Sequence, residues 1–245
     1  TMAVSIKSAR EIELMREAGK RLAHVHQELE AMIAPGISTW EIDAKGEKLI
    51  RDCGCIPNFL HYNGYPASIC VSVNDEVVHG IPRKDRYLKE GDIVSLDAGL
   101  IYKGYHSDAA RTHAVGKVST EAQKLMDVTK QSFFEGIKMA KEGQHLHDIS
   151  RAIEEYVTPY GYGIVRDLVG HGIGTALHED PQIPNYAQKR RGVRLQAGMT
   201  LAIEPMINAG TWQVRFLRDG WTVVTKDGSL SAHYENTILV TDGEP

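Results

Sequence analysis

The chain carries one order of elements twice, and this internal repeat restricts its fold more than any other feature. The matched positions are Gly36 and Gly143, Ile42 and Ile149, Gly54 and Gly161, and Asp97 and Glu204, each pair separated by the same interval. In each half, two helical segments precede strand-like segments, and the last strand contains the acidic residue. We predict an α+β fold of two pseudo-symmetric halves, about 6–112 and 115–240. No Pro- or Ser-rich linker separates the halves, so we expect a single domain over residues 1–245.

Local signals mark where the helices and strands begin. Ser8 with Glu11 forms a capping box before the first helix, and Ser38 with Glu41 forms another before the second. Glycines and a Pro-Gly pair are expected to end these helices, at 35–36 and at 54. The second half has helical segments at 119–143 and 146–157, and strand-like segments of the first half begin at positions 67, 76 and 92.

Asp97 interrupts the otherwise apolar strand DIVSLDAGLIY, and Asp108 follows beyond Lys103-Gly104. A two-residue turn at this pair would place Gly99 opposite Asp108 and make the two aspartates diagonal neighbours on one face of a hairpin. Two buried carboxylates so close repel each other. They require either a shared proton or a divalent cation, and only the cation predicts further ligands elsewhere.

Residues suited to be those ligands are present. Glu204 lies in the apolar run MTLAIEPM, Glu235 precedes a β-branched run, and His171 is flanked by glycines that permit close main-chain approach. Two Asp, two Glu and one His suit a pair of ions such as Mn, Fe or Co, whereas zinc alone would prefer more His or Cys. Such a pair can hold a bridging hydroxide and polarise a carbonyl group.

Two further histidines follow strand-like or glycine-rich segments. His79 lies in VVHGIP and His178 in TALHEDP, and either can orient a substrate or carry a proton. A single histidine beside a Gly-Pro turn is more often structural, so neither is assigned on its own. The other eight histidines, at 24, 26, 61, 106, 113, 145, 147 and 233, are read as ordinary core or surface residues.

Composition excludes several classes of protein. The net charge is −4 and no basic block is interleaved with aromatics, so we expect no direct nucleic-acid site. The short basic stretch QKRRGVR is read as a solvated loop. Three cysteines favour a reducing compartment, and no apolar run is long enough for a membrane span, so we expect a cytoplasmic protein. No serine-hydrolase elbow, H-E-x-x-H zinc helix or phosphate-binding loop occurs.

Together with HGIP, GHGIG and IEPM, the five proposed ligands resemble the pattern of the methionine aminopeptidases over Ile6 to Val240. The resemblance implies the pita-bread fold, with a central antiparallel sheet flanked by outer helices. It also implies hydrolytic removal of the N-terminal initiator methionine from nascent proteins and peptides, with preference for a small second residue. His171 and Glu204 are too close in sequence for the helical insert of type II enzymes, so the chain resembles the bacterial type I group. The chain length disfavours a proline-directed peptidase, and a metal-free peptide-binding module would not need all five ligands.

The resemblance assigns roles to the ligands. Asp97 would chelate one of two divalent ions, and His171 and Glu204 the other, while Asp108 and Glu235 bridge them. The ions would be Co, Mn, Fe or Zn. Glu204 would also act as general base toward the attacking water.

The resemblance also implies how substrate is bound. His79 would contact the scissile nitrogen, and His178 would hold the peptide carbonyl or the oxyanion. The expected methionine pocket consists of Phe59, Tyr62, Tyr65, Cys70, Leu177 and Trp221 together with these histidines. Leu177 stands where close relatives often have an aromatic residue. Further expectations are a monovalent cation near Asn74 and Ser231, a transient ribosome contact and a monomeric state.

Overall fold

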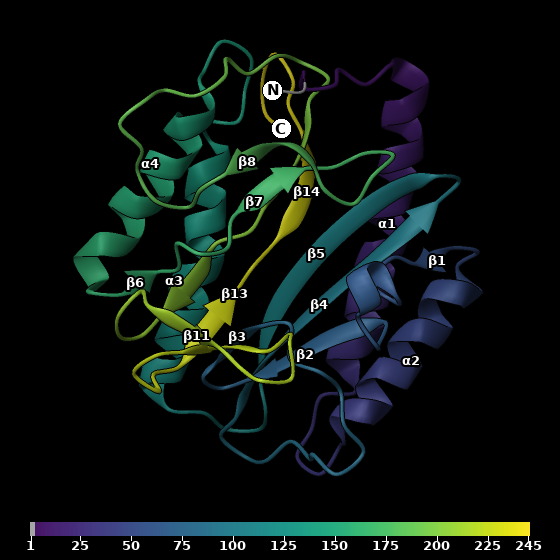
Figure 1. Cartoon of the computed structure of the whole chain (residues 1–245), viewed down its shortest axis with the longest axis vertical. Coiled ribbons are helices and arrows are strands. Elements are labelled where there is room, and N and C mark those ends of the chain that lie inside the picture. Colours follow the sequence, from purple (N-terminus) through teal and green to yellow (C-terminus); the bar gives the residue numbers. More distant parts are fainter. Residues whose placement is uncertain (1–2) are drawn as a thin grey trace.

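Two helices cover the sheet of the first half. In the computed structural model, which describes residues 3–245, these are α1 (Ala9–Ala31) and α2 (Thr39–Asp52). Both predicted capping boxes are formed, since each N-cap serine accepts a hydrogen bond from the glutamate N–H and the glutamate side chain bonds back. In Figure 1, α1 and α2 lie on one side of the molecule, and the helices of the second half lie on the other.

The strands of the first half surround one long hairpin. They are β1 (Ile56–Pro57), β2 (Ile69–Val73), β3 (Glu76–Val78), β4 (Ile93–Tyr102) and β5 (Tyr105–Ala114). β4 pairs with β1, β2 and β5, always antiparallel. Lys103 and Gly104 have φ of 47° and 86°, as a two-residue type I′ turn requires, and Gly99 lies opposite Asp108. The predicted turn and register are confirmed.

The second half repeats the pattern with shorter strands. Its helices are α3 (Thr120–Ile137) and α4 (Leu146–Val157). Its strands are β6 (Gly163–Ile164), β7 (Gly170–Gly172), β8 (Glu179–Ile183), β9 (Thr200–Ile203), β10 (Met206–Asn208), β11 (Val214–Phe216), β12 (Val223–Thr225), β13 (Ser231–His233) and β14 (Asn236–Leu239). Single turns of 3₁₀ helix occur at Tyr62–Gly64 and Thr158–Tyr160. Each half has its own large apolar cluster, so the core is divided as the repeat predicts.

The counterpart of the β4–β5 hairpin is broken in the second half. β9 pairs with β14 and β10 pairs with β13, so that the two strand pairs flank a gap in the ladder. The gap contains Glu204-Pro205 on one side and Tyr234-Glu235 on the other. Proline has no N–H to donate, which interrupts regular pairing at this point. Both glutamates therefore lie where the strands are interrupted, whereas Asp97 and Asp108 lie within continuous strands.

Two predicted elements end earlier than the sequence indicates. The helical segment 119–143 was expected to reach Gly143, and this is wrong because α3 ends at Ile137. Beyond it, the N–H of Glu142 donates to the carbonyl of Thr241, and that of Gly143 donates to the carbonyl of Leu195. Main-chain bonds to distant segments replace the last helical turns. The strand-like segment EVVHGI, which begins at Glu76, likewise forms a strand only as far as Val78.

The two hairpins meet at one main-chain bridge in the centre of the molecule. The N–H of Ala110 on β5 donates to the carbonyl of Glu235 at 3.1 Å, and the N–H of Glu235 donates to the carbonyl of Ala110 at 3.0 Å. In Figure 1, β5 runs beside β14 and β13. Among residues 3–245, no helix combines the length and apolar character needed to cross a membrane.

Threonine hydroxyls extend this bridge on both sides. Oγ1 of Thr237 accepts from the N–H of Asp108 at 3.0 Å and donates to its carbonyl at 2.9 Å. Oγ1 of Thr112 makes the equivalent pair of bonds to His233, both at 2.9 Å. We call the bridge and these two hydroxyls the seam. Each hydroxyl satisfies two main-chain groups that have no strand partner on that side.

Thr237→Val removes one seam hydroxyl at nearly constant volume. It leaves the N–H and carbonyl of Asp108 without partners, and we expect the free energy of unfolding to fall by about 1–3 kcal/mol. Denaturant unfolding measures this change. Thr241→Val, which removes an exposed hydroxyl near the chain end, is the matched control and should cost less than about 0.5 kcal/mol. Equal losses in the two variants would contradict the role of the seam.

Candidate metal centre

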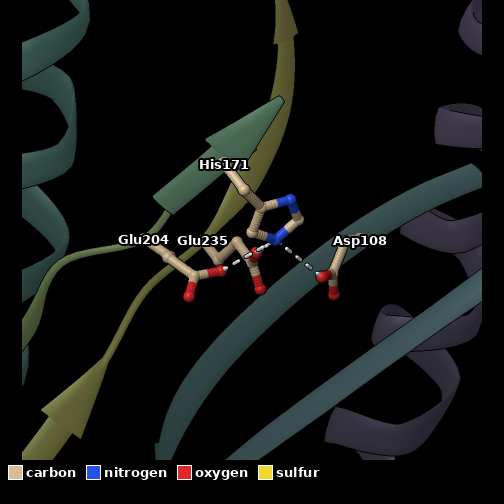
Figure 2. Close-up of side chains that lie close together, drawn as sticks. All are labelled: Asp108, His171, Glu204 and Glu235. Atoms are coloured by element: carbon tan, nitrogen blue, oxygen red, sulfur yellow. Dashed lines mark ion pairs between the residues drawn. The ribbon is translucent and has the colours of Figure 1, made fainter. Parts of the chain in front are cut away.

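His171 stands among three carboxylates, one from β5 and two from the interrupted strand pairs of the second half (Figure 2). Its Nε2 lies 3.7 Å from Oδ2 of Asp108, 3.7 Å from Oε2 of Glu204 and 3.9 Å from Oε2 of Glu235. The Nδ1–H of His171 donates to the carbonyl of Gly172 at 2.9 Å, which leaves Nε2 directed toward the carboxylates. This geometry suits a metal ligand.

The donor atoms form two groups that share one residue. Asp108, His171, Glu204 and Glu235 each offer a donor atom within 4.8 Å of the others, and Asp97, His233 and Glu235 do the same. Several of these oxygens are buried without any hydrogen-bond partner, namely Oδ1 of Asp97, Oδ1 of Asp108 and both oxygens of Glu235. Buried carboxylate oxygens without donors call for cations. The residues therefore fit a pair of divalent ions, and Glu235 belongs to both donor groups.

Burial and mutual repulsion dominate the charge state of the carboxylates. Burial raises the pKa of Asp97 well above its ordinary value, and the charge of Asp108 adds to the effect. Burial also raises the pKa of Glu235, together with the charges of Asp108, Glu204 and Asp97. The pKa of Glu204 is raised by burial too, although the neighbouring Glu235 carboxyl group and the charge of His171 oppose this. Without divalent cations, some of these groups must hold protons.

Asp108 and His171 behave as an ion pair within this cluster. Burial opposes ionisation of Asp108, but the nearby His171 ring and its charge lower the pKa of Asp108 overall. Burial likewise acts to lower the pKa of His171, but the nearby carboxylates of Asp108 and Glu204 raise it to about 9. A divalent ion would take the place of the proton on Nε2, since a coordinating histidine must be neutral.

Small residues allow the strands to approach the centre closely. A side chain on Gly170 would collide with the carbonyl of Ala202, and one on Gly172 would collide with the carbonyl of Asp180. The glycines beside His171 therefore let β7 lie between β8 and β9, as their sequence context predicts. On β4, the side chain of Asp97 shares a face with the diagonal neighbour Asp108.

A cavity of about 210 Å³ opens beside these ligands. Its walls are Phe59, Tyr62, Asn63, Tyr65, Cys70, His79, Asp97, Asp108, His171, Leu177, His178, Glu204 and Trp221. All eight residues that the sequence assigns to substrate binding line it, together with four of the five predicted ligands. Glu235 is fully buried behind the wall. The sequence did not predict Asn63 as a residue of this cavity. Only its position next to Tyr62 in a tight turn could have indicated it.

His178 and Tyr62 lie together at the exposed rim of this cavity. The hydroxyl of Tyr62 is 2.8 Å from Nδ1 of His178. The ring centroids of His178 and His171 are 4.2 Å apart. Desolvation and the charge of His171 lower the pKa of His178, so its ring is neutral near pH 7. A neutral ring held by Tyr62 can donate one hydrogen bond into the cavity.

His79 enters the cavity from a strained stretch of main chain. Its φ is 60°, in the left-handed region that a non-glycine residue seldom adopts. A side chain on Gly80 would strike the carbonyl of Val71, so the segment is held tightly against β2. Burial lowers the pKa of His79. Backbone strain of this kind concentrates at functional sites, and here it explains why β3 ends at Val78.

His233 was read from the sequence as an ordinary histidine, but its ring lies among the ligands. Only 2% of it is exposed, and Nε2 has no hydrogen-bond partner. Burial lowers its pKa to about 3. Its position two residues before Glu235 on an interrupted strand was the signal that could have identified it.

The segment near Asn74 and Ser231 is fully hydrogen-bonded within the protein. The side chain of Asn74 donates to Asp92 and accepts from the N–H of Ile93, and Oγ of Ser231 donates to Asn208. A monovalent cation at this place would depend on main-chain carbonyl groups.

Comparison with known proteins agrees with this site. Residues 13–242 match the family described as metallopeptidase family M24. The methionine aminopeptidase of Clostridium acetobutylicum is 53% identical over 99% of this chain and 97% of its own length. Methionine aminopeptidase 1 of Bacillus subtilis is 52% identical over 96% of this chain and 95% of its own.

A solved structure shows the same fold. The crystal structure of methionine aminopeptidase from Thermotoga maritima superposes with a TM-score of 0.96 at 46% identity, covering 99% of this chain and 97% of that one. The predicted pita-bread architecture, with antiparallel sheets and outer helices, is confirmed. The chain therefore belongs to metallopeptidase family M24 and, within it, to the type I methionine aminopeptidases.

Proposed function

We propose that this chain hydrolyses the peptide bond after an N-terminal methionine, using two divalent ions held by Asp97, Asp108, His171, Glu204 and Glu235. The observation that best supports this function is the pair of donor groups that share Glu235, beside a cavity with largely apolar walls. When bound, the ions would supply an activated water and polarise the scissile carbonyl group. Because ligands come from both halves, the two halves act as one catalytic domain.

The cavity suits the side chain of methionine. Phe59, Tyr65, Cys70 and Leu177 are buried in one apolar cluster, against which Trp221 packs. The ring of Trp221 meets that of Tyr65 edge-on at 5.1 Å. Polarizable thioethers pack favourably against aromatic rings. At about 210 Å³, the cavity is smaller than the about 300–1,000 Å³ of typical drug-sized pockets, which favours one terminal residue over a longer segment.

Three side chains would move or hold protons. Glu204 has one face toward the cavity and a raised pKa, which suits a general base that accepts the proton of the attacking water. Tyr62 would donate to Nδ1 of His178, leaving Nε2–H to bind the peptide carbonyl or the developing oxyanion. His79, neutral and held rigidly, would contact the scissile nitrogen and assist departure of the amine.

Finer properties are proposed on the resemblance alone. They are Co, Mn, Fe or Zn as the metal, initiator methionine of nascent chains as the substrate, and a small residue in second position. We also propose a cytoplasmic monomer with transient ribosome contact, and a monovalent cation bound near Asn74 and Ser231.

The activity itself is tested with two peptides. Met-Gly-Met-Met should release methionine when the protein is loaded with Co²⁺ or Mn²⁺, and release should stop when a chelator is added. An Ala-Pro peptide should not be cleaved under the same conditions, because its first side chain does not fill the cavity. Absence of methionine release in every metal condition would refute the proposal.

Asp97→Ala tests the ligand assignment. We expect the variant to lose bound metal, measured by elemental analysis, and to lose activity by more than the roughly 100-fold that an outer-shell change costs. The chelator-treated variant should be as stable as the parent or more so, because it removes a carboxyl group whose burial beside Asp108 is unfavourable. Asp52→Asn, an exposed carboxylate paired with Lys48, is the control and should change neither property. Full activity in Asp97→Ala would contradict the assignment.

The stability of chelator-treated protein should depend on pH. The pKa of His171 is about 9 in the folded state and about 6.5 when unfolded, so between these values the folded state binds more protons. The free energy of unfolding should therefore fall as pH rises from 6.5 to 9. Buried histidines with a lowered pKa, such as His26, change the free energy of unfolding with pH only below pH 6.5. Calorimetry of the parent and of His171→Gln checks this, and equal slopes would contradict it.

A further inference from the structure

His233 lies at the metal centre but has no place in the five-ligand pattern. A donor nitrogen of its ring is within 4.8 Å of carboxylate oxygens of Asp97 and Glu235. Nε2 is buried and without a partner, as are Oδ1 of Asp97 and both oxygens of Glu235. In the other donor group, the ring of His171 likewise offers a nitrogen within 4.8 Å of carboxylate oxygens. The two groups of donor atoms thus contain one imidazole each.

Buried polar atoms without hydrogen-bond partners destabilise the folded protein unless a proton or an ion joins them. Each buried polar atom without a partner costs about 1–3 kcal/mol. Two carboxylates and an imidazole could pair through a proton, but the structure shows no hydrogen bond between His233 and either acid among the described residues. An ion bound to all three would satisfy every orphaned atom at once.

The main chain holds His233 firmly in place. Its N–H and carbonyl both bond to Oγ1 of Thr112 in the seam, and β13 pairs it with Met206 on β10. The ring also lines a second, polar cavity of about 360 Å³, whose walls include Arg111 and Tyr234. Water in this cavity can accept Nδ1–H, which would leave the lone pair on Nε2 for a metal.

We propose that His233 is a direct nitrogen ligand of the ion held by Asp97 and Glu235. The inference rests on the proposed dinuclear centre and adds a sixth protein ligand to it. Each ion then has one imidazole, His171 for one and His233 for the other. Imidazole favours ions such as Co, Fe and Zn over Mg and Mn, so this ligand should shift the metal preference of the chain in that direction.

Pulsed electron paramagnetic resonance on Mn²⁺-loaded protein tests the assignment. His171→Gln removes the established imidazole candidate, so nitrogen coupling from a directly bound ring should persist in this variant. It should disappear in the double variant His171→Gln/His233→Gln. Loss of all nitrogen coupling in His171→Gln while Mn²⁺ remains bound would overturn the proposal. Failure of Mn²⁺ to bind the parent protein would instead refute the metal centre itself.

Calorimetric titration of chelator-treated protein with Co²⁺ provides the second measurement. His233→Gln should weaken one of two binding events by at least about ten-fold and leave the other unchanged. His113→Gln is the matched control, because His113 lines the same polar cavity but belongs to neither donor group. Unchanged affinities in His233→Gln would overturn the proposal. Weaker binding in His233→Gln, together with nitrogen coupling that persists in His171→Gln/His233→Gln, would also overturn it, because the His233 ring would then act only through other groups.

Discussion

The seam between β5 and the strand pair β13–β14 is the constraint on which the rest of the structure depends. It consists of a single main-chain bridge, Ala110 to Glu235, with a threonine hydroxyl on either side. Glu235 is itself a predicted metal ligand, and Thr237 bonds to the main chain of a second one, Asp108. This contact between the two halves also brings Asp108 of one half close to Glu235 of the other.

The site gathers four carboxylates, of which Asp108 and Glu235 are buried and Asp97 and Glu204 partly buried, and this is unfavourable without cations. Burial and mutual repulsion raise the pKa of three of them, and only Asp108, paired with His171, has a lowered pKa. Without cations, this cluster would destabilise the fold rather than stabilise it. The arrangement is understandable as one that is stabilised by its ions and that uses their charge for hydrolysis, since interactions within a buried site are screened little by solvent.

Much of the fold and of the site follows from local sequence. Ser8 and Ser38 mark helix starts because their side chains cap the first turn without help from distant residues. Lys103-Gly104 sets the register that places Asp97 beside Asp108, because a two-residue turn admits only one pairing. The end of α3 and the role of His233 did not follow in this way. α3 ends where main-chain bonds to Leu195 and Thr241 begin, and His233 acquires its neighbours only when β13 lies against Thr112.

The sequence by itself determined the repeated helix-and-strand order, the hairpin and the chemical type of each ligand. These features depend on hydrogen bonds and side-chain spacing between residues close together in the chain, so the sequence pattern is enough to predict them. Only the tertiary structure decided which atoms face one another. It placed His171 at 3.7 Å from two carboxylates, drew the strained His79 into the cavity and brought His233 to Asp97. These outcomes depend on the packing of the two halves across the seam, and residues far apart in the chain carry no local signal of it.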